Sequence, residues 1–170
     1  MTLTTKILNI LESISGVKTV MYDSGFSANV RIDRKEGPYA LLYTLSDWSI
    51  DVSKGTAKEA AETEVFFFDA SKLDATGEQK DITVNEMETL ALEFIAKVMS
   101  EKSISVKDDT IRMRSTYGKF DKFCVGVSVH IKLEEKQGTC IDDLIPTPTP
   151  NPPQEAPNLD AEDPIDNELV

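Results

Sequence analysis

The sequence contains one histidine, His130, and two cysteines, Cys124 and Cys140. A histidine that acts as a catalytic base needs a nucleophile and an orienting acid within hydrogen-bond reach. Cys124 precedes His130 on the same polar face of a predicted strand, about 20 Å away at about 3.3 Å per residue. This spacing does not predict a nucleophilic dyad. We therefore expect His130 to occupy a surface position, and the two cysteines to be reduced thiols of a cytosolic protein.

Metal-ion and phosphate sites are not predicted either. One histidine and two separated cysteines do not make the four-ligand set of a structural zinc ion. The segment from Asp69 to Gly77 carries oxygen donors but lacks the dense acidic ladder of a calcium loop. Neither glycine pattern that cradles phosphate, GxGxxG or GxxxxGK[ST], is present. We expect no cofactor, no metal ion and no enzymatic activity, and the remaining alternative is an enzyme that uses Asp69 or Asp74.

The charge of the chain is unevenly distributed. The net charge is −12, but residues 1–141 hold all 18 basic residues and 22 of the 30 acidic ones. Residues 142–170 hold the other eight acidic residues, no basic residue and seven of the eight prolines. Proline removes backbone donors and the acidic groups repel one another, so this segment is not expected to form a packed core. The sequence predicts one domain over 1–141 and a disordered, proline-rich acidic tail over 142–170, with an extended polyproline-like run at 146–153.

The composition also limits the partners. No block of Lys or Arg supplies the phosphate neutralisation that a duplex-binding protein needs, so direct nucleic-acid binding is not expected. Tyr39, Tyr43 and Trp48 could form an RNA-stacking platform, but their acidic neighbours favour core packing. The N-terminus lacks the pattern of a signal peptide, and no apolar run approaches the length of about 18 residues that a membrane span needs. We therefore expect a soluble, intracellular protein.

A short amphipathic helix is predicted at the N-terminus. Apolar residues recur at steps of three and four between residues 3 and 14, with polar residues between them. Thr2 or Thr4 can cap this helix, because a threonine hydroxyl accepts a bond from a free N–H of the first turn. Gly16 is expected to end the helix in a left-handed conformation. A single apolar stripe of this length is not stable alone in water, so the helix must pack on another element.

The remaining pattern predicts strands around one longer helix. This helix is expected at 84–101, where Thr83 and Glu86 form a capping box. Residues 65–68 are all apolar and predict a central strand covered on both faces. The other strands are predicted at 17–22, 26–32, 39–52, 104–113 and 123–133, with a turn at 115–119, a hairpin loop or helical turn at 53–62 and a polar loop at 69–81.

These elements predict an α+β fold: an antiparallel β-sheet with an N-terminal helix and a longer helix packed across it, in the order α-β-β-β-α-β-β. This order resembles the tail-terminator or tail-completion (head–tail joining) proteins of long-tailed bacteriophages. In that family a Pro-Tyr often opens a central apolar strand, and Gly37-Pro38-Tyr39 matches it here. Residues 64–69 match the strand that leads into the long helix, and 104–135 match the closing hairpin. The segments 53–62 and 142–170 depart from the family pattern.

The resemblance implies a non-enzymatic virion assembly protein. Copies of the chain would form a ring, commonly a hexamer, that caps the finished tail tube and joins it to the head connector. The partners are then other copies of the chain, the tail tube and head connector proteins. The protein would lie in the host cytoplasm during assembly and later in the neck of the virion. The alternative is a non-viral adaptor or binding module whose acidic, proline-rich tail docks a basic partner.

Subunit or partner contacts are expected in two charged loops, at 33–37 and 69–81. Edge strands and loops from neighbouring subunits would make these contacts, and no residue would perform chemistry. Both segments could equally be plain solvated loops. The candidate contact residues are Asp33, Arg34, Lys35, Glu36, Asp69, Lys72 and Asp74.

Overall fold

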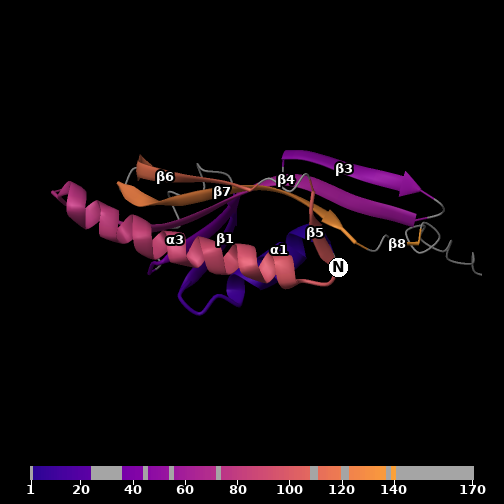
Figure 1. The fold of residues 1–170 in the computed structure, drawn as a ribbon, viewed down its shortest axis with the longest axis horizontal. Helices are drawn as coiled ribbons and strands as arrows, with labels where there is room; N and C mark the ends of the chain where they lie inside the picture. Colours follow the sequence, from indigo (N-terminus) through magenta and orange to yellow (C-terminus); the bar gives the residue numbers. More distant parts are fainter. Residues whose placement is uncertain are drawn as a thin grey trace, which may run out of the picture.

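The computed structural model describes residues 2–23, 36–43, 46–53, 56–71, 74–107, 111–119, 123–136 and 139–140. Its elements are α1 (Leu3–Glu12), β1 (Thr19–Asp23), β2 (Tyr39–Tyr43), β3 (Ser46–Ser53), β4 (Thr56–Ala70), α3 (Gly77–Ser100), β5 (Ile104–Val106), β6 (Arg112–Lys119), β7 (Cys124–Glu135) and β8 (Thr139–Cys140). These helices lie on one side of an eight-stranded sheet (Figure 1). The predicted α+β class, with an N-terminal helix and a longer helix on the sheet, is confirmed. The predicted strand at 26–32 and the tail at 142–170 lie outside the described residues.

Two long strands, β4 and β7, form the centre of the sheet. They pair antiparallel from Ala60–Glu134 to Ala70–Cys124. On the other side of β4, β2 pairs with the strand's second half and β3 with its first half. On the edge of β7 that faces away from β4, β6 pairs with the first part of the strand and β5 pairs with its end. These pairs are antiparallel, as predicted, and so is the short pairing of β8 with the start of β4. The pair formed by β1 and β2 is parallel.

Alternation along β4 divides the apolar core between the two faces of the sheet. Val65 and Phe67 belong to the cluster that α1 and α3 cover, where the rings of Phe67 and Phe94 are 5.8 Å apart. Phe66 and Phe68 point to the opposite face, where their rings stack at 4.8 Å. All four residues at 65–68 are fully buried, which confirms a central strand covered on both sides. We term the side of Phe66 and Phe68 the open face, because no described helix lies on it.

Two glycines mark close approaches between elements. A Cβ on Gly126 of β7 would lie 1.9 Å from the carbonyl oxygen of Phe67, so the β4–β7 contact accepts no side chain there. A Cβ on Gly16 would lie 2.5 Å from Leu90 Cδ2 of α3. The predicted left-handed Gly16 is wrong, since Gly118 is the only described glycine with a positive φ. The helix α1 is capped by the Thr2 hydroxyl, as expected, and ends at Glu12.

The helix α3 begins earlier than predicted. Thr76 is its N-cap, and Thr76 and Gln79 form the capping box. Thr83 lies inside the helix, where its hydroxyl donates to the carbonyl of Gln79 at 3.3 Å, so the predicted start at Thr83 is wrong. The polar loop expected at 69–81 is correspondingly short. Neither helix in the described part of the chain is long and apolar enough to cross a membrane.

The strand β4 also begins earlier than predicted. The link expected at 53–62 contains the first half of β4, which pairs with β3 from Ser53–Thr56 to Ser46–Glu62. This half was not recognised in the sequence because it carries polar residues on both faces. It can carry them because it extends past the region where the helices cover the sheet (Figure 1). The turn expected at 115–119 is wrong as well, since these residues belong to β6.

Candidate functional site, a basic recess on the open face

A recess of about 330 Å³ lies beside β4, β7 and β6. Its walls carry four basic side chains and one acidic one, in addition to His130 and Ile131. The chain as a whole has a net charge of −12, so the recess concentrates positive charge on an acidic protein. The basic residues are Lys107, Arg112, Arg114 and Lys132, and the acidic residue is Glu62.

The strand register places these side chains on the open face. Directly paired residues project to the same side of a sheet. His130 of β7 pairs with Glu64 of β4 on one side and with Arg112 of β6 on the other. Phe66 pairs with Ser128, one step along the same face. The recess therefore continues the face that carries Phe66, with a carboxylate, an imidazole and a guanidinium in one row across three strands.

Arg112 and Arg114 are the two guanidinium groups of the recess. Both are exposed, and neither side chain forms an ion pair or hydrogen bond with any described residue. Lys107 differs, because its Nζ lies 4.0 Å from Glu134 Oε2. A guanidinium presents its donors as a planar fork that matches a carboxylate or a phosphate. The recess thus offers two guanidinium groups to an anion from outside the described fold.

His130 has an acidic neighbour that its position in the sequence did not reveal. His130 Nε2 lies 3.4 Å from Glu64 Oε1, which is an ion pair when the imidazole is protonated. No hydroxyl or thiol of the described residues hydrogen-bonds to His130. Ser128 shares its face but lies two residues along β7, about 7 Å away at the strand rise. The arrangement suits ion binding better than nucleophilic catalysis, which needs the nucleophile in contact with the base.

The three predicted contact residues that the structure describes, Glu36, Asp69 and Asp74, are not among the residues that line the recess. Glu36 is exposed, with its Oε2 3.7 Å from Lys18 Nζ. Asp69 is half-buried near the end of β4, and Asp74 is exposed just before α3. The two predicted loops do meet, because a Cβ on Gly37 would lie 2.2 Å from Asp69 Oδ1. Asp33, Arg34, Lys35 and Lys72 lie outside the described residues.

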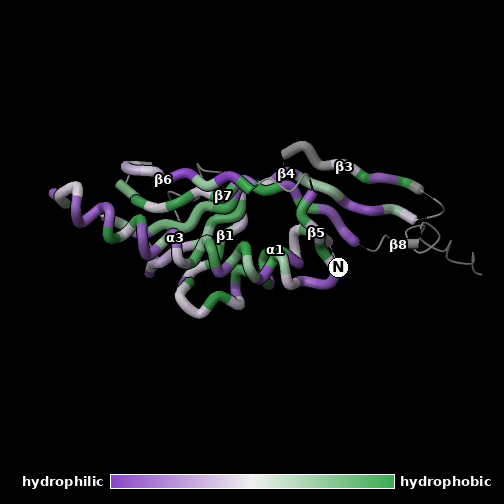
Figure 2. The backbone as a smooth tube through the Cα atoms, in the orientation of Figure 1, coloured by the Kyte–Doolittle hydropathy of each residue, from purple (hydrophilic) through white to green (hydrophobic). Residues whose placement is uncertain are grey.

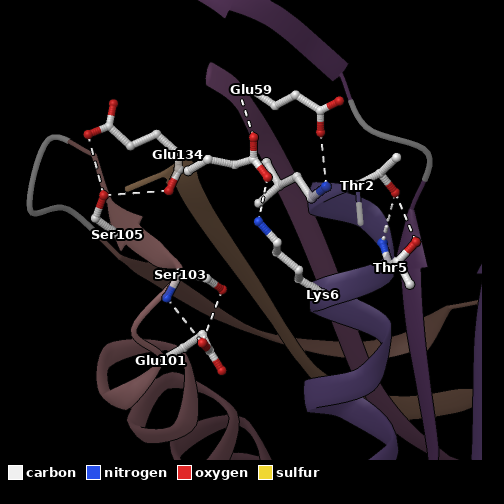
Figure 3. Close-up of polar contacts among 10 residues, drawn as sticks. Thr2, Thr5, Lys6, Glu59, Glu101, Ser103, Ser105 and Glu134 are labelled. Atoms are coloured by element: carbon white, nitrogen blue, oxygen red, sulfur yellow. Dashed lines mark hydrogen bonds and ion pairs between the residues drawn. The ribbon is translucent and has the colours of Figure 1, made fainter. Parts of the chain in front are cut away.

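A second polar cluster joins α1 to the ends of β4 and β7 (Figure 3). Glu135 is 6% exposed, and its carboxylate accepts hydrogen bonds from Lys6 Nζ and, at 3.3 Å, from the backbone N–H of Glu59. The Glu59 carboxylate in turn accepts the backbone N–H of Leu3 at 2.9 Å. That N–H belongs to the first turn of α1 and has no partner within the helix. These contacts hold α1 on the sheet, and the charged groups find their partners within the chain. We therefore assign the cluster a structural role.

Hydrogen bonds also fix both ends of α3. The backbone N–H and the hydroxyl of Ser103 donate to Glu101 Oε1, and these bonds hold the pKa of Glu101 below its usual value of 4.5. The Tyr117 hydroxyl donates to Asp81 Oδ1 at 2.9 Å, and this bond raises the pKa of Tyr117 above 10.0. The first contact ties the end of α3 to the segment before β5, and the second ties its start to β6.

Sequence reasoning missed the recess because its basic residues come from separate segments. Arg112 and Arg114 alternate along β6, and His130 and Lys132 alternate along β7, so each segment alone looks like an ordinary polar face. The missing information was the pairing of β6 with β7, which brings the two short series together. The alternating basic residues at 112 and 114 were the signal that could have revealed it.

Neither a metal-ion site in the described part of the chain nor a match to known proteins was found. Among the described residues, no three His, Cys, Asp or Glu side chains gather as a metal-ion site. A scan against known protein families and a search of curated protein sequences both found no match.

Proposed function

We propose that this chain is a non-enzymatic assembly protein that forms a homo-oligomeric ring, in the manner of a phage tail terminator. The ring would cap a tail tube and join it to a head connector. The protein would be in the host cytoplasm during assembly and then in the neck of the virion. The proposal rests on the family resemblance in the sequence and on one structural observation, the hairpin formed by β3 and the first half of β4.

This hairpin extends beyond the two helices (Figure 1). It also carries two exposed apolar side chains on β3. Ile50 is 47% exposed and Val52 is 61% exposed. They pair with Glu59 and Ala57, so they share the side of the sheet that the helices cover elsewhere. Figure 2 shows hydrophobic stretches along β3 that alternate with hydrophilic ones. The hairpin therefore presents an apolar surface that no helix of the described chain covers.

The outer edge of β3 adds backbone donors and acceptors to this surface. Among the described residues β3 pairs only with β4, so its other edge is open to a further strand. An exposed edge strand with apolar side chains is a template for pairing with another chain. In a closed ring each subunit's edge can meet its neighbour, so that no edge is left to continue polymerisation. The hairpin is thus a suitable element for subunit contact.

Light scattering during size-exclusion chromatography of the full chain tests this proposal. We expect a ring, visible also by negative-stain microscopy, at concentrations where the Ile50→Lys/Val52→Lys variant is monomeric. Two lysines on the hairpin would place positive charge in an apolar contact and remove its hydrophobic area. A strictly monomeric wild-type chain at high concentration, with no ring in the presence of tail tube protein, would contradict the proposal.

A matched control tests whether dissociation of the oligomer is specific to substitutions on the hairpin. Leu92 and Met99 on the outer surface of α3 are 53% and 68% exposed, close to the values for Ile50 and Val52. The Leu92→Lys/Met99→Lys variant carries the same change in charge and a similar loss of apolar area. We expect this variant to keep the oligomer. If both double variants dissociate equally, the hairpin is not the contact surface.

A further inference from the structure

We propose that the basic recess binds the acidic tail of the same chain, residues 142–170. The tail would lie across Arg112 and Arg114 on the open face and present its carboxylates to them. This inference does not depend on ring formation. It differs from the adaptor hypothesis, in which the tail binds a basic partner, because here the basic surface is supplied by the chain itself.

Charge complementarity is the first argument. Four basic residues and one acidic residue line the recess, and two further carboxylates lie beside it, Glu64 against His130 and Glu134 against Lys107. The tail carries eight acidic residues and no basic one. Arg112 and Arg114 have no side-chain partner among the described residues, so a tail carboxylate can approach them without displacing a described acidic group. Such charge-assisted contacts are roughly twice as strong as hydrogen bonds between neutral groups.

The length of the tail is the second argument. The described chain ends at Cys140, which pairs with Thr56, and the recess begins at Glu62 on the same strand. These two positions are about 20 Å apart at the rise of an antiparallel strand. The strand β8 runs antiparallel to β4 and therefore points away from the recess, so the tail would have to turn back to reach it. The proline-rich run at 146–153 would span about 25 Å if it is extended, which delivers the acidic residues 155–168 to the recess.

Attachment of the tail to the domain favours binding within one chain. A segment held by a short linker has an effective concentration of the order of millimolar near its own recess. A tail from a separate copy, not held in the same ring, reaches that concentration only in a very concentrated solution. A contact of a few exposed ion pairs is weak, so it forms chiefly where the tether supplies this advantage.

Zero-length crosslinking of the full chain with a water-soluble carbodiimide tests the proposal. The reagent joins an Asp or Glu carboxylate to a Lys amine only where the two are in contact. We expect the tail carboxylates to crosslink to Lys107 and Lys132 in preference to the other lysines of the chain. Raising the salt from about 0.1 M to about 1 M shortens the Debye length from about 10 Å to about 3 Å, and should remove the preference.

Charge reversal at the recess is the specific test. Arg112→Glu/Arg114→Glu retains both crosslinkable lysines, and we expect it to lower the yield of tail crosslinks roughly fivefold or more, because attraction becomes repulsion. The milder Arg112→Gln/Arg114→Gln variant should give an intermediate yield. Circular dichroism checks that each variant is folded. Lys80→Glu/Lys102→Glu makes the same change in charge at the two ends of α3 and should leave the yield unchanged.

Two outcomes would overturn the proposal. One is a distribution of tail crosslinks over all exposed lysines that charge reversal at Arg112 and Arg114 does not alter. The other is crosslinking between chains, detected by mixing chains of natural and ¹⁵N isotopic composition, which would place the tail on another copy.

Discussion

The two halves of β4 are parts of one continuous strand but have opposite surroundings. In the second half, Val65 to Phe68 are fully buried between the helices and the open-face cluster. In the first half, Lys58, Glu59 and Glu62 keep part of their surface in solvent, and β3 beside them exposes Ile50 and Val52. The difference shows that strand pairing alone does not make a core. The same ladder of hydrogen bonds stabilises the fold in one half and presents a surface in the other.

Truncation of a large side chain in the second half of β4, compared with one on β3 beside the first half, should give the largest contrast. Phe66→Ala removes a fully buried ring that stacks on Phe68 at 4.8 Å, and we expect a loss of about 3–5 kcal/mol in the free energy of unfolding. Ile50→Ala, on the exposed hairpin, should change it by about 0.5 kcal/mol or less. Urea denaturation of both variants measures the difference. Equal losses would mean that the hairpin is part of the core.

The contact between α1 and the strand ends should give a smaller effect. Lys6→Met leaves the buried Glu135 carboxylate with the Glu59 N–H as its remaining bond, and we expect a loss of about 2 kcal/mol. The Lys6→Met/Glu135→Met variant should recover part of this loss, because no unpaired charge remains. Lys97→Met, which breaks the exposed pair with Glu93, is the control and should cost about 0.5 kcal/mol or less.

The urea midpoints of these variants show whether Glu135 stabilises the fold chiefly through its pairing with Lys6 or through its bond to Glu59. If Lys6→Met and Lys97→Met have equally small effects, then burial of Glu135 does not strengthen its pairing. If the double variant is less stable than Lys6→Met, the carboxylate contributes through its bond to Glu59 more than through Lys6.

The boundary between the halves of β4 should give the smallest effect, with the opposite sign. Thr63 is 2% exposed, and its Oγ1 has no hydrogen-bond partner in the described structure. Valine has nearly the same shape without the hydroxyl, so Thr63→Val should raise the free energy of unfolding by about 1 kcal/mol. Thermal unfolding should show a higher midpoint. A lower midpoint would indicate that the hydroxyl has a partner, such as a bound water molecule.

The sequence predicted the elements of the core and missed those that extend past it. Residues 65–68 and the apolar face of α3 from Val84 onward were recognisable because burial imposes an apolar period. The start of α3 was missed because Ile82 is its one apolar residue before Val84 and is 55% exposed. The first half of β4 was missed because it also lacks a periodic series of large apolar residues. The recess escaped prediction because the sequence shows the polar face of each strand but does not show which strands are neighbours.

The central pairing of β4 with β7 also sets the order in which the chain can fold. Phe66 and Ser128 face each other in the sheet, but all of α3, β5 and β6 lie between them in the sequence. During synthesis β4 can pair with β2 and β3 long before β7 exists. Until then, the aromatic residues of β4 lack the strand that pairs with them in the centre of the sheet. Pairing across so long a stretch of chain is slow, typically milliseconds to seconds. The native sheet can therefore close only after nearly the whole domain has been made.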